Sequence, residues 1–128
     1  MVDEVALILT LLSEMNYRPE QLDRNRIKIV QGGVAATIMI YEDTSLSMRC
    51  LVEGGEDFIF ELADVNDANY DMRFGKFAIS NQSLLLECDF VFEPVGSDAR
   101  ERLTHIMKIW DANLVRLREL VANSRQPA

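Results

Sequence analysis

The strongest structural signal in the chain is a long apolar repeat near its C-terminal end. Between residues 98 and 122, large apolar side chains recur at spacings of three and four, which places them on one side of an α-helix. The basic side chains of this segment lie mainly off that stripe. A helix with such a continuous stripe buries it against other elements of the fold. The stripe consists of Leu103, Ile106, Met107, Trp110, Leu114, Leu117 and Val121.

The middle of the chain alternates apolar and polar residues with a period of two, which is typical of β-strands with one buried face. The clearest case is the segment 83–92, in which every second residue is apolar and is expected to face the core. Gly32-Gly33 and Asn81-Gln82 mark tight turns between neighbouring strands. Five strands are expected, at residues 26–30, 34–41, 46–52, 74–80 and 83–92.

Two further helices are expected, at residues 2–15 and 59–70, whereas residues 20–26 are polar and show no pattern. The resulting order is α-β-β-β-α-β-β-α. Helices and strands do not alternate as they do in parallel βαβ folds, and the pattern contains no linker or internal repeat. We therefore predict one α+β domain over residues 1–128, with an antiparallel sheet and helices packed on it.

The charge of the chain restricts its partners. Its 128 residues carry 21 acidic and 13 basic side chains, for a formal net charge of −8. Nucleic acids and anionic membranes attract clustered cations, so we expect neither as a partner. Nine of the acidic residues lie between residues 42 and 71, where the one basic residue is Arg49. This acidic block is either a solvated face or a surface that attracts a basic partner.

The N-terminal segment and the cysteines indicate a cytoplasmic protein. The apolar run at residues 5–12 is too short to span a membrane, and no basic residue precedes it as in a secretory signal. Cys50 and Cys88 lie in separate predicted strands without CxxC spacing. Two buried thiols are expected, with a disulfide between neighbouring strands as the alternative.

Motifs for bound ions or phosphates are incomplete. Asp67, Asn69 and Asp71 match the first ligands of a calcium loop, but Met72 and Ala78 occupy the positions that need Gly and Glu. The two Gly-Gly pairs lack the spacing of phosphate-binding loops. We therefore predict no metal and no cofactor.

Catalytic residues are also not apparent. His105 is the one histidine of the chain, and no GxSxG nucleophile motif accompanies it. A zinc site would need further ligands at a recognisable spacing. An enzyme would need a pocket with a perturbed carboxylate, for which Glu87 and Asp89 are the candidates.

Three segments carry a resemblance to a known family. They read Val-Asn-Asp-Ala-Asn at residues 65–69, Arg-Phe-Gly-Lys-Phe-Ala-Ile at 73–79 and Leu-Leu-Leu-Glu-Cys-Asp-Phe at 84–90, and an amphipathic helix follows. This resembles the YbjN family of bacterial proteins, which are described as proposed regulators of sensory transduction. The family shares the fold of type III secretion chaperones, whose element order is the one derived above. Its pattern is matched by Asn66, Asn69, Gly75 and Lys76.

The resemblance implies structural roles for these residues and no catalytic ones. The two asparagines are expected to hydrogen-bond the end of the short helix, and Gly75 to permit close approach of the backbone. Secretion chaperones of this fold are acidic cytoplasmic homodimers that hold an extended segment of a partner protein. The resemblance therefore implies a homodimer that binds a protein partner.

The sequence favours a non-enzymatic regulatory or chaperone-like adaptor. Leu85 and Val91 are candidates for the partner or dimer surface. Trp110 is expected to anchor the core, with an interface as the alternative. Two other functions stay open at this point: a dedicated type III secretion chaperone for one secreted client, and an enzyme with a carboxylate site.

Overall fold

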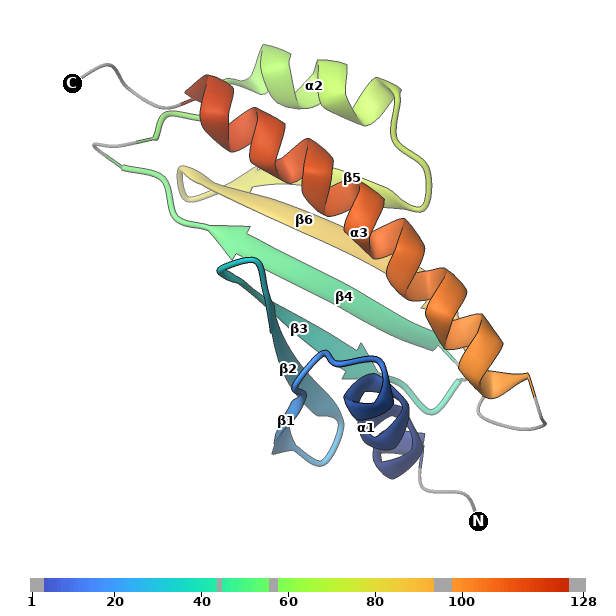
Figure 1. Ribbon diagram of the computed structural model, residues 1–128. Coiled ribbons are helices and arrows are strands. Elements are labelled where there is room, and N and C mark those ends of the chain that lie inside the picture. The colour runs from blue at the N-terminus through green and yellow to red at the C-terminus, as the bar shows by residue number, and fades with distance from the viewer. Residues whose placement is uncertain (1–3, 44, 56–57, 94–97, 125–128) are drawn as a thin grey trace.

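The computed structural model describes residues 4–43, 45–55, 58–93 and 98–124. These residues form one antiparallel sheet with helices α1 and α3 on one of its faces (Figure 1). The predicted α+β class is confirmed. Residues 2–3 of the first expected helix lie outside the described residues. In chain order the elements are α1 (Glu4–Glu14), β1 (Glu20–Asp23), β2 (Arg26–Gln31), β3 (Val34–Ile40), β4 (Ser45–Val52), α2 (Leu62–Tyr70), β5 (Gly75–Ser80), β6 (Ser83–Val91) and α3 (Ala99–Ser124).

The strands are ordered β1-β2-β3-β4-β6-β5 across the sheet, and each neighbouring pair is antiparallel. Both predicted two-residue turns are present. Gly32 and Gly33 join β2 to β3 with φ of 58° and 80°, and Asn81 and Gln82 join β5 to β6 with φ of 50° and 68°. Positive φ at both central positions gives a turn whose twist matches that of the strands.

Strand β1 was not predicted, so the observed order has one strand more than expected. It is an edge strand, and all four of its residues are exposed. Its pairing with β2 is irregular between Gln21 and Asp23. A strand without a buried face has no apolar alternation for a sequence pattern to show. The second helix begins at Leu62 and not at residue 59, because the backbone of Glu61 is extended.

The core lies between the sheet and the two helices. Helix α3 crosses the sheet diagonally, and α1 lies beside the β2–β3 side of it (Figure 1). The side chains of β6 alternate as predicted, with the apolar set inward. The inward residues of β6 and the residue that follows it are all buried: Leu84, Leu86, Cys88, Phe90 and Phe92. We call the opposite side of the sheet, which carries Leu51, Leu85, Glu87 and Val91, the open face.

The strands of the sheet are not paired to the same extent. β2 pairs with β3 from Arg26 to Gln31, and β4 pairs with β6 from Ser45 to Val52. The central pair β3–β4 is shorter, because its register runs from Thr37↔Arg49 to Ile40↔Leu46 and stops there. Residues 34–36 of β3 and 50–52 of β4 continue beyond this point without pairing with each other.

Both cysteines are buried and free, so the disulfide alternative is wrong. Burial raises the pKa of each thiol to about 11. At neutral pH both thiols are therefore protonated, and they pack as small apolar side chains. The Sγ atom of Cys88 accepts a hydrogen bond from Asn113 Nδ2 at 3.1 Å, which ties β6 to α3.

Candidate functional site

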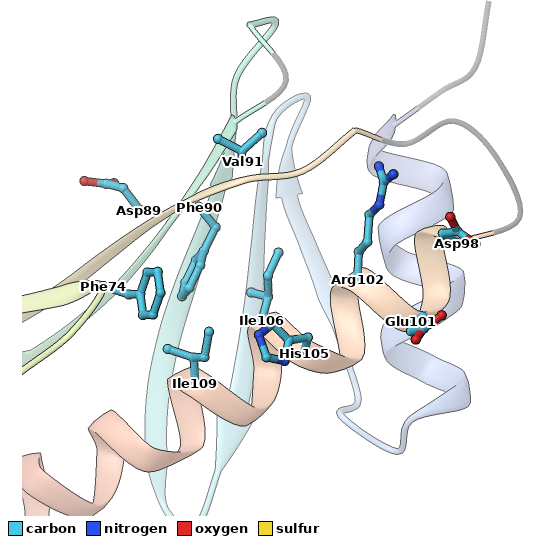
Figure 2. A pocket seen from close by; sticks show the side chains of 10 residues that line it. All are labelled: Phe74, Asp89, Phe90, Val91, Asp98, Glu101, Arg102, His105, Ile106 and Ile109. Atoms are coloured by element: carbon cyan, nitrogen blue, oxygen red, sulfur yellow. The ribbon is translucent and has the colours of Figure 1, made fainter.

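A groove of about 680 Å³ lies between the end of β6 and the first half of α3. Its interior is lined by apolar side chains. Phe74 and Phe90 point into it from the sheet side, and Ile106 and Ile109 point into it from α3 (Figure 2). Because Phe90 and Ile106 are buried and Phe74 is exposed, the groove leads from the surface to the core. We call it the aromatic groove.

Phe74 has the most unusual environment in the aromatic groove. Its ring stacks on that of Phe90, with 6.4 Å between the centroids and 23° between the planes, yet the residue is 63% exposed. Its φ is 67°, in the left-handed region that large residues rarely occupy. Holding a large side chain in that region costs about 1–2 kcal/mol. The chain thus keeps a strained, solvent-exposed aromatic ring at the mouth of the groove, as is common at binding sites.

Charged groups line the outer part of the groove. Asp98, which directly precedes α3, borders it together with Glu101 and Arg102 on the first turn of α3, and Arg102 Nη1 lies 3.9 Å from a carboxylate oxygen of Glu93. His105 lies beside Ile106 at the edge of the apolar interior (Figure 2). Asp89 also borders the groove, but its carboxylate points away from the apolar side chains (Figure 2). Apolar contact inside and charge at the margin suit recognition of a protein segment.

The carboxylates considered for an enzyme lie on the open face. A small pocket of about 230 Å³ borders Glu87 and Asp89 there. Glu87 is held by two cations: Arg49 Nε lies 3.0 Å from one carboxylate oxygen, and Lys76 Nζ lies 3.7 Å from the other. These three residues are cross-strand neighbours on β4, β6 and β5. Lys76, one of the four family-pattern residues, therefore takes part in a charge ladder across the sheet.

The other family-pattern residues lie around strand β5. Asn69 Nδ2 donates a hydrogen bond to the Phe77 carbonyl at 2.9 Å, and Phe77 N donates to Asn69 Oδ1 at 2.6 Å. The sequence suggested that this side chain would hydrogen-bond the end of α2. In the structure it instead hydrogen-bonds the backbone of β5, at the edge of the sheet. Asn66 is exposed, and its side chain has no hydrogen bond among the described residues.

Gly75 provides the close approach that was predicted for it. A Cβ at this position would lie 2.5 Å from Cys88 Sγ and 2.9 Å from Asn113 Nδ2. These atoms belong to the neighbouring strand and to α3. A larger residue would therefore push α3 away from the sheet beside the aromatic groove.

The three candidate surface residues have different environments. Val91 is 76% exposed and borders the rim of the aromatic groove, but its side chain points away from Phe90 and Ile106, toward the open face (Figure 2). Leu85 lies on the open face, half-buried between Leu51 and Ala78 on the adjacent strands. Trp110 is 0% exposed, so it lies in the core of the chain and contributes nothing to its surface.

The sequence did not single out Phe74, Ile106 and Ile109 as parts of one site. Ile109 lies at the margin of the apolar stripe of α3, which is where a partly exposed residue is expected. Phe74 was expected to be the first residue of the strand at 74–80, but β5 begins at Gly75, and the positive φ of Phe74 directs its ring into the groove. Their proximity depends on how α3 crosses the sheet.

Metal and membrane sites were also sought in the part of the chain that the structure describes. No cluster of three or more potential metal ligands occurs there. No helix among those residues is both long and apolar enough to cross a membrane.

Comparisons with known proteins reveal a relation of fold. The sequence matches no family model, and no curated protein matches it. Among solved structures, the crystal structure of YbjN from E. coli, a proposed transcription regulator, is similar with a TM-score of 0.63. The alignment covers 96% of both chains at 10% sequence identity. The chain therefore shares the α+β fold of YbjN along nearly its whole length.

Proposed function

We propose that this chain is a non-enzymatic adaptor that acts in regulation by holding a protein partner in the aromatic groove. The observation that carries the proposal is the exposed ring of Phe74, stacked on the buried ring of Phe90 at the mouth of an apolar groove that reaches the core. Exposed aromatic and aliphatic side chains around a concave apolar site are typical anchors for protein segments. The shared fold with YbjN, itself a proposed transcription regulator, is consistent with a regulatory role.

The charge of the chain favours action through a protein and not through direct contact with DNA. With a net charge of −8, the surface repels phosphates. The acidic block at residues 42–71 instead attracts basic segments over long range and raises their rate of encounter. We propose a basic or mixed-charge partner with apolar anchor residues.

Two finer assignments go with this proposal. The chain forms a homodimer in the cytoplasm, and it is a YbjN-like regulator in preference to a type III secretion chaperone with one secreted client. The enzyme alternative has less support, because the carboxylate of Asp89 points away from the groove and Glu87 is engaged by two cations. The identity of the bound protein separates a regulator from a secretion chaperone.

The test uses two exposed apolar residues that differ in location. Phe74 lines the aromatic groove, whereas Val30 is 53% exposed on β2 and does not line it. We expect tagged wild-type protein to recover one stoichiometric partner from its own cells, as measured by quantitative mass spectrometry. Phe74→Ser should reduce this recovery at least fivefold, and Val30→Ser should leave it unchanged.

Each alternative gives a different result in this experiment. Equal recovery with both variants would exclude the aromatic groove as the binding site. Light scattering of the purified variants completes the test. A Phe74→Ser protein that becomes monomeric while Val30→Ser stays dimeric would make the groove a dimer interface.

A further inference from the structure

A second concave site lies at the place where the central strands separate. A pocket of about 540 Å³ is bordered by residues 33–35 on one side, by residues 50–52 on the other, and by the last turns of α3. These strand segments lie beyond Thr37↔Arg49, the last pair of β3 with β4. We call this site the seam pocket.

The composition of the seam pocket is unusual for so acidic a protein. Among the residues that the structure describes, its lining contains one charged side chain, that of Arg118, and no carboxylate. The other described lining residues are apolar or glycine, in a chain with eight more acidic than basic side chains. The apolar lining side chains come from Val34, Ala35, Cys50, Leu51, Val52, Phe58, Leu117, Val121 and Ala122.

The guanidinium of Arg118 is available to an anion. It makes no ion pair or hydrogen bond with any residue that the structure describes. It lies against the β2–β3 turn, where a Cβ on Gly32 would come within 2.5 Å of Nη2. The absence of a side chain at Gly32 therefore makes room for the guanidinium at the mouth of the pocket.

The diverging strands add polar groups to this site. In a continuous antiparallel pair, the backbone groups of residues 34–36 and 50–52 that point toward each other would be hydrogen-bonded. Here the two segments are not paired with each other, so these backbone groups form no hydrogen bonds between the segments. The site thus combines apolar walls, one available cation and backbone groups at the edge of a strand.

We propose that the seam pocket binds a small carboxylate with an apolar body, such as a medium-chain fatty acid. The carboxylate pairs with the guanidinium of Arg118, and the hydrocarbon lies between the strands and α3. The pocket volume falls within the range of about 300–1,000 Å³ that is usual for small-molecule sites. The proposal concerns a site separate from the aromatic groove and does not depend on the function proposed above.

The first test is calorimetric titration of the purified chain with octanoate, decanoate and 1-octanol. Decanoate should bind about tenfold more tightly than octanoate, because each added methylene group contributes a factor of about three to four. Octanol, which lacks the charge, should bind at least fivefold more weakly than octanoate. No binding of decanoate at millimolar concentration would overturn the proposal.

Variants locate the site. Arg118→Gln should lower decanoate affinity at least fivefold, whereas Lys108→Gln, which alters an exposed cation on the same helix outside the pocket, should not. Ala122→Trp should abolish binding by filling the pocket. Melting temperatures close to that of the wild type show that each variant is folded. Unchanged binding by both Arg118→Gln and Ala122→Trp would place decanoate elsewhere and contradict the proposal.

The two buried thiols provide an internal control in the unmodified protein. Cys50 lines the seam pocket and Cys88 does not. Decanoate should slow the reaction of Cys50 with a thiol reagent at least threefold and leave that of Cys88 unchanged. Equal protection of both thiols would indicate general stabilisation of the fold and would contradict a site at the seam. If a peptide protects Cys50 and decanoate does not, the ligand of the seam pocket is a protein segment and the fatty-acid proposal is wrong.

Discussion

The sheet consists of two three-stranded units that differ in how their outer edge strands are covered or bonded. The first unit is β1-β2-β3 with α1, and its outer edge is the short, exposed strand β1. The second unit is β4-β6-β5 with α2, and its outer edge is bonded by the side chain of Asn69. The length of pairing varies within the units, because β1 and β2 share three residue pairs whereas β4 pairs with β6 from Ser45 to Val52. β3 and β4 pair from Thr37 to Ile40, so the sheet is continuous between the two units, although this junction is shorter than the β2–β3 and β4–β6 pairings.

Helix α3 adds side-chain contacts with both units to the β3–β4 pairing. Toward the first unit, Asp111 accepts hydrogen bonds from Tyr17 Oη at 3.2 Å and from Gln31 Nε2 at 2.5 Å. Toward the second unit, Asn113 bonds Cys88, and Arg116 Nη2 lies 3.1 Å from Asp71 Oδ2. The side-chain contacts between the two units therefore run through this helix. Both candidate binding sites lie along it, one at each half.

The largest expected effect comes from removing the main anchor of α3. Trp110 is completely buried, and Trp110→Ala should lower the free energy of unfolding by about 3–5 kcal/mol. Urea denaturation measures this, with Val115→Ala as the control, because Val115 is half-exposed on the same helix. The control should change stability by less than about 0.5 kcal/mol. A Trp110→Ala protein of normal stability would contradict the assignment of Trp110 as the main anchor of α3.

A smaller effect is expected at the edge of the second unit. Asn69→Ala leaves the N–H and C=O of Phe77 without their partners and should cost about 1–3 kcal/mol. Asn66→Ala, three residues earlier on the same helix, should change stability by less than about 0.5 kcal/mol, because Asn66 is exposed and makes no such bond. Chemical denaturation of both variants checks the difference. Equal losses of stability would mean that Asn69 acts through the helix propensity of α2 and not through its hydrogen bonds to Phe77 of β5.

The two units also differ in how well the sequence predicts them. The strands of the second unit and the inward face of β6 were predicted, because their apolar residues alternate across a buried sheet. Strand β1 was missed, because four exposed residues carry no such alternation. Gly75 was assigned its role from its place inside a strand. The two pockets could not be predicted, since both depend on where α3 crosses the sheet and where β3 leaves β4.

The smallest expected effect is a pH dependence at the contact between α3 and the first unit. Burial, together with the negative charge of Asp111 and its hydrogen bond, raises the pKa of Tyr17 to about 12 from an ordinary value of 10. Between these values the unfolded chain loses the phenolic proton while the folded chain keeps it, so stability falls as pH rises from 10 to 12. The stabilisation is fully present below pH 10.

Tyr17→Phe removes this ionisation, whereas every other titrating group is common to both proteins. The stability advantage of the wild type over Tyr17→Phe, measured by urea denaturation, should therefore shrink between pH 9 and pH 11. Parallel stability curves over that range would show that Tyr17 is as free to ionise in the folded chain as in the unfolded one, and that the contact with Asp111 contributes nothing to holding the first unit on α3.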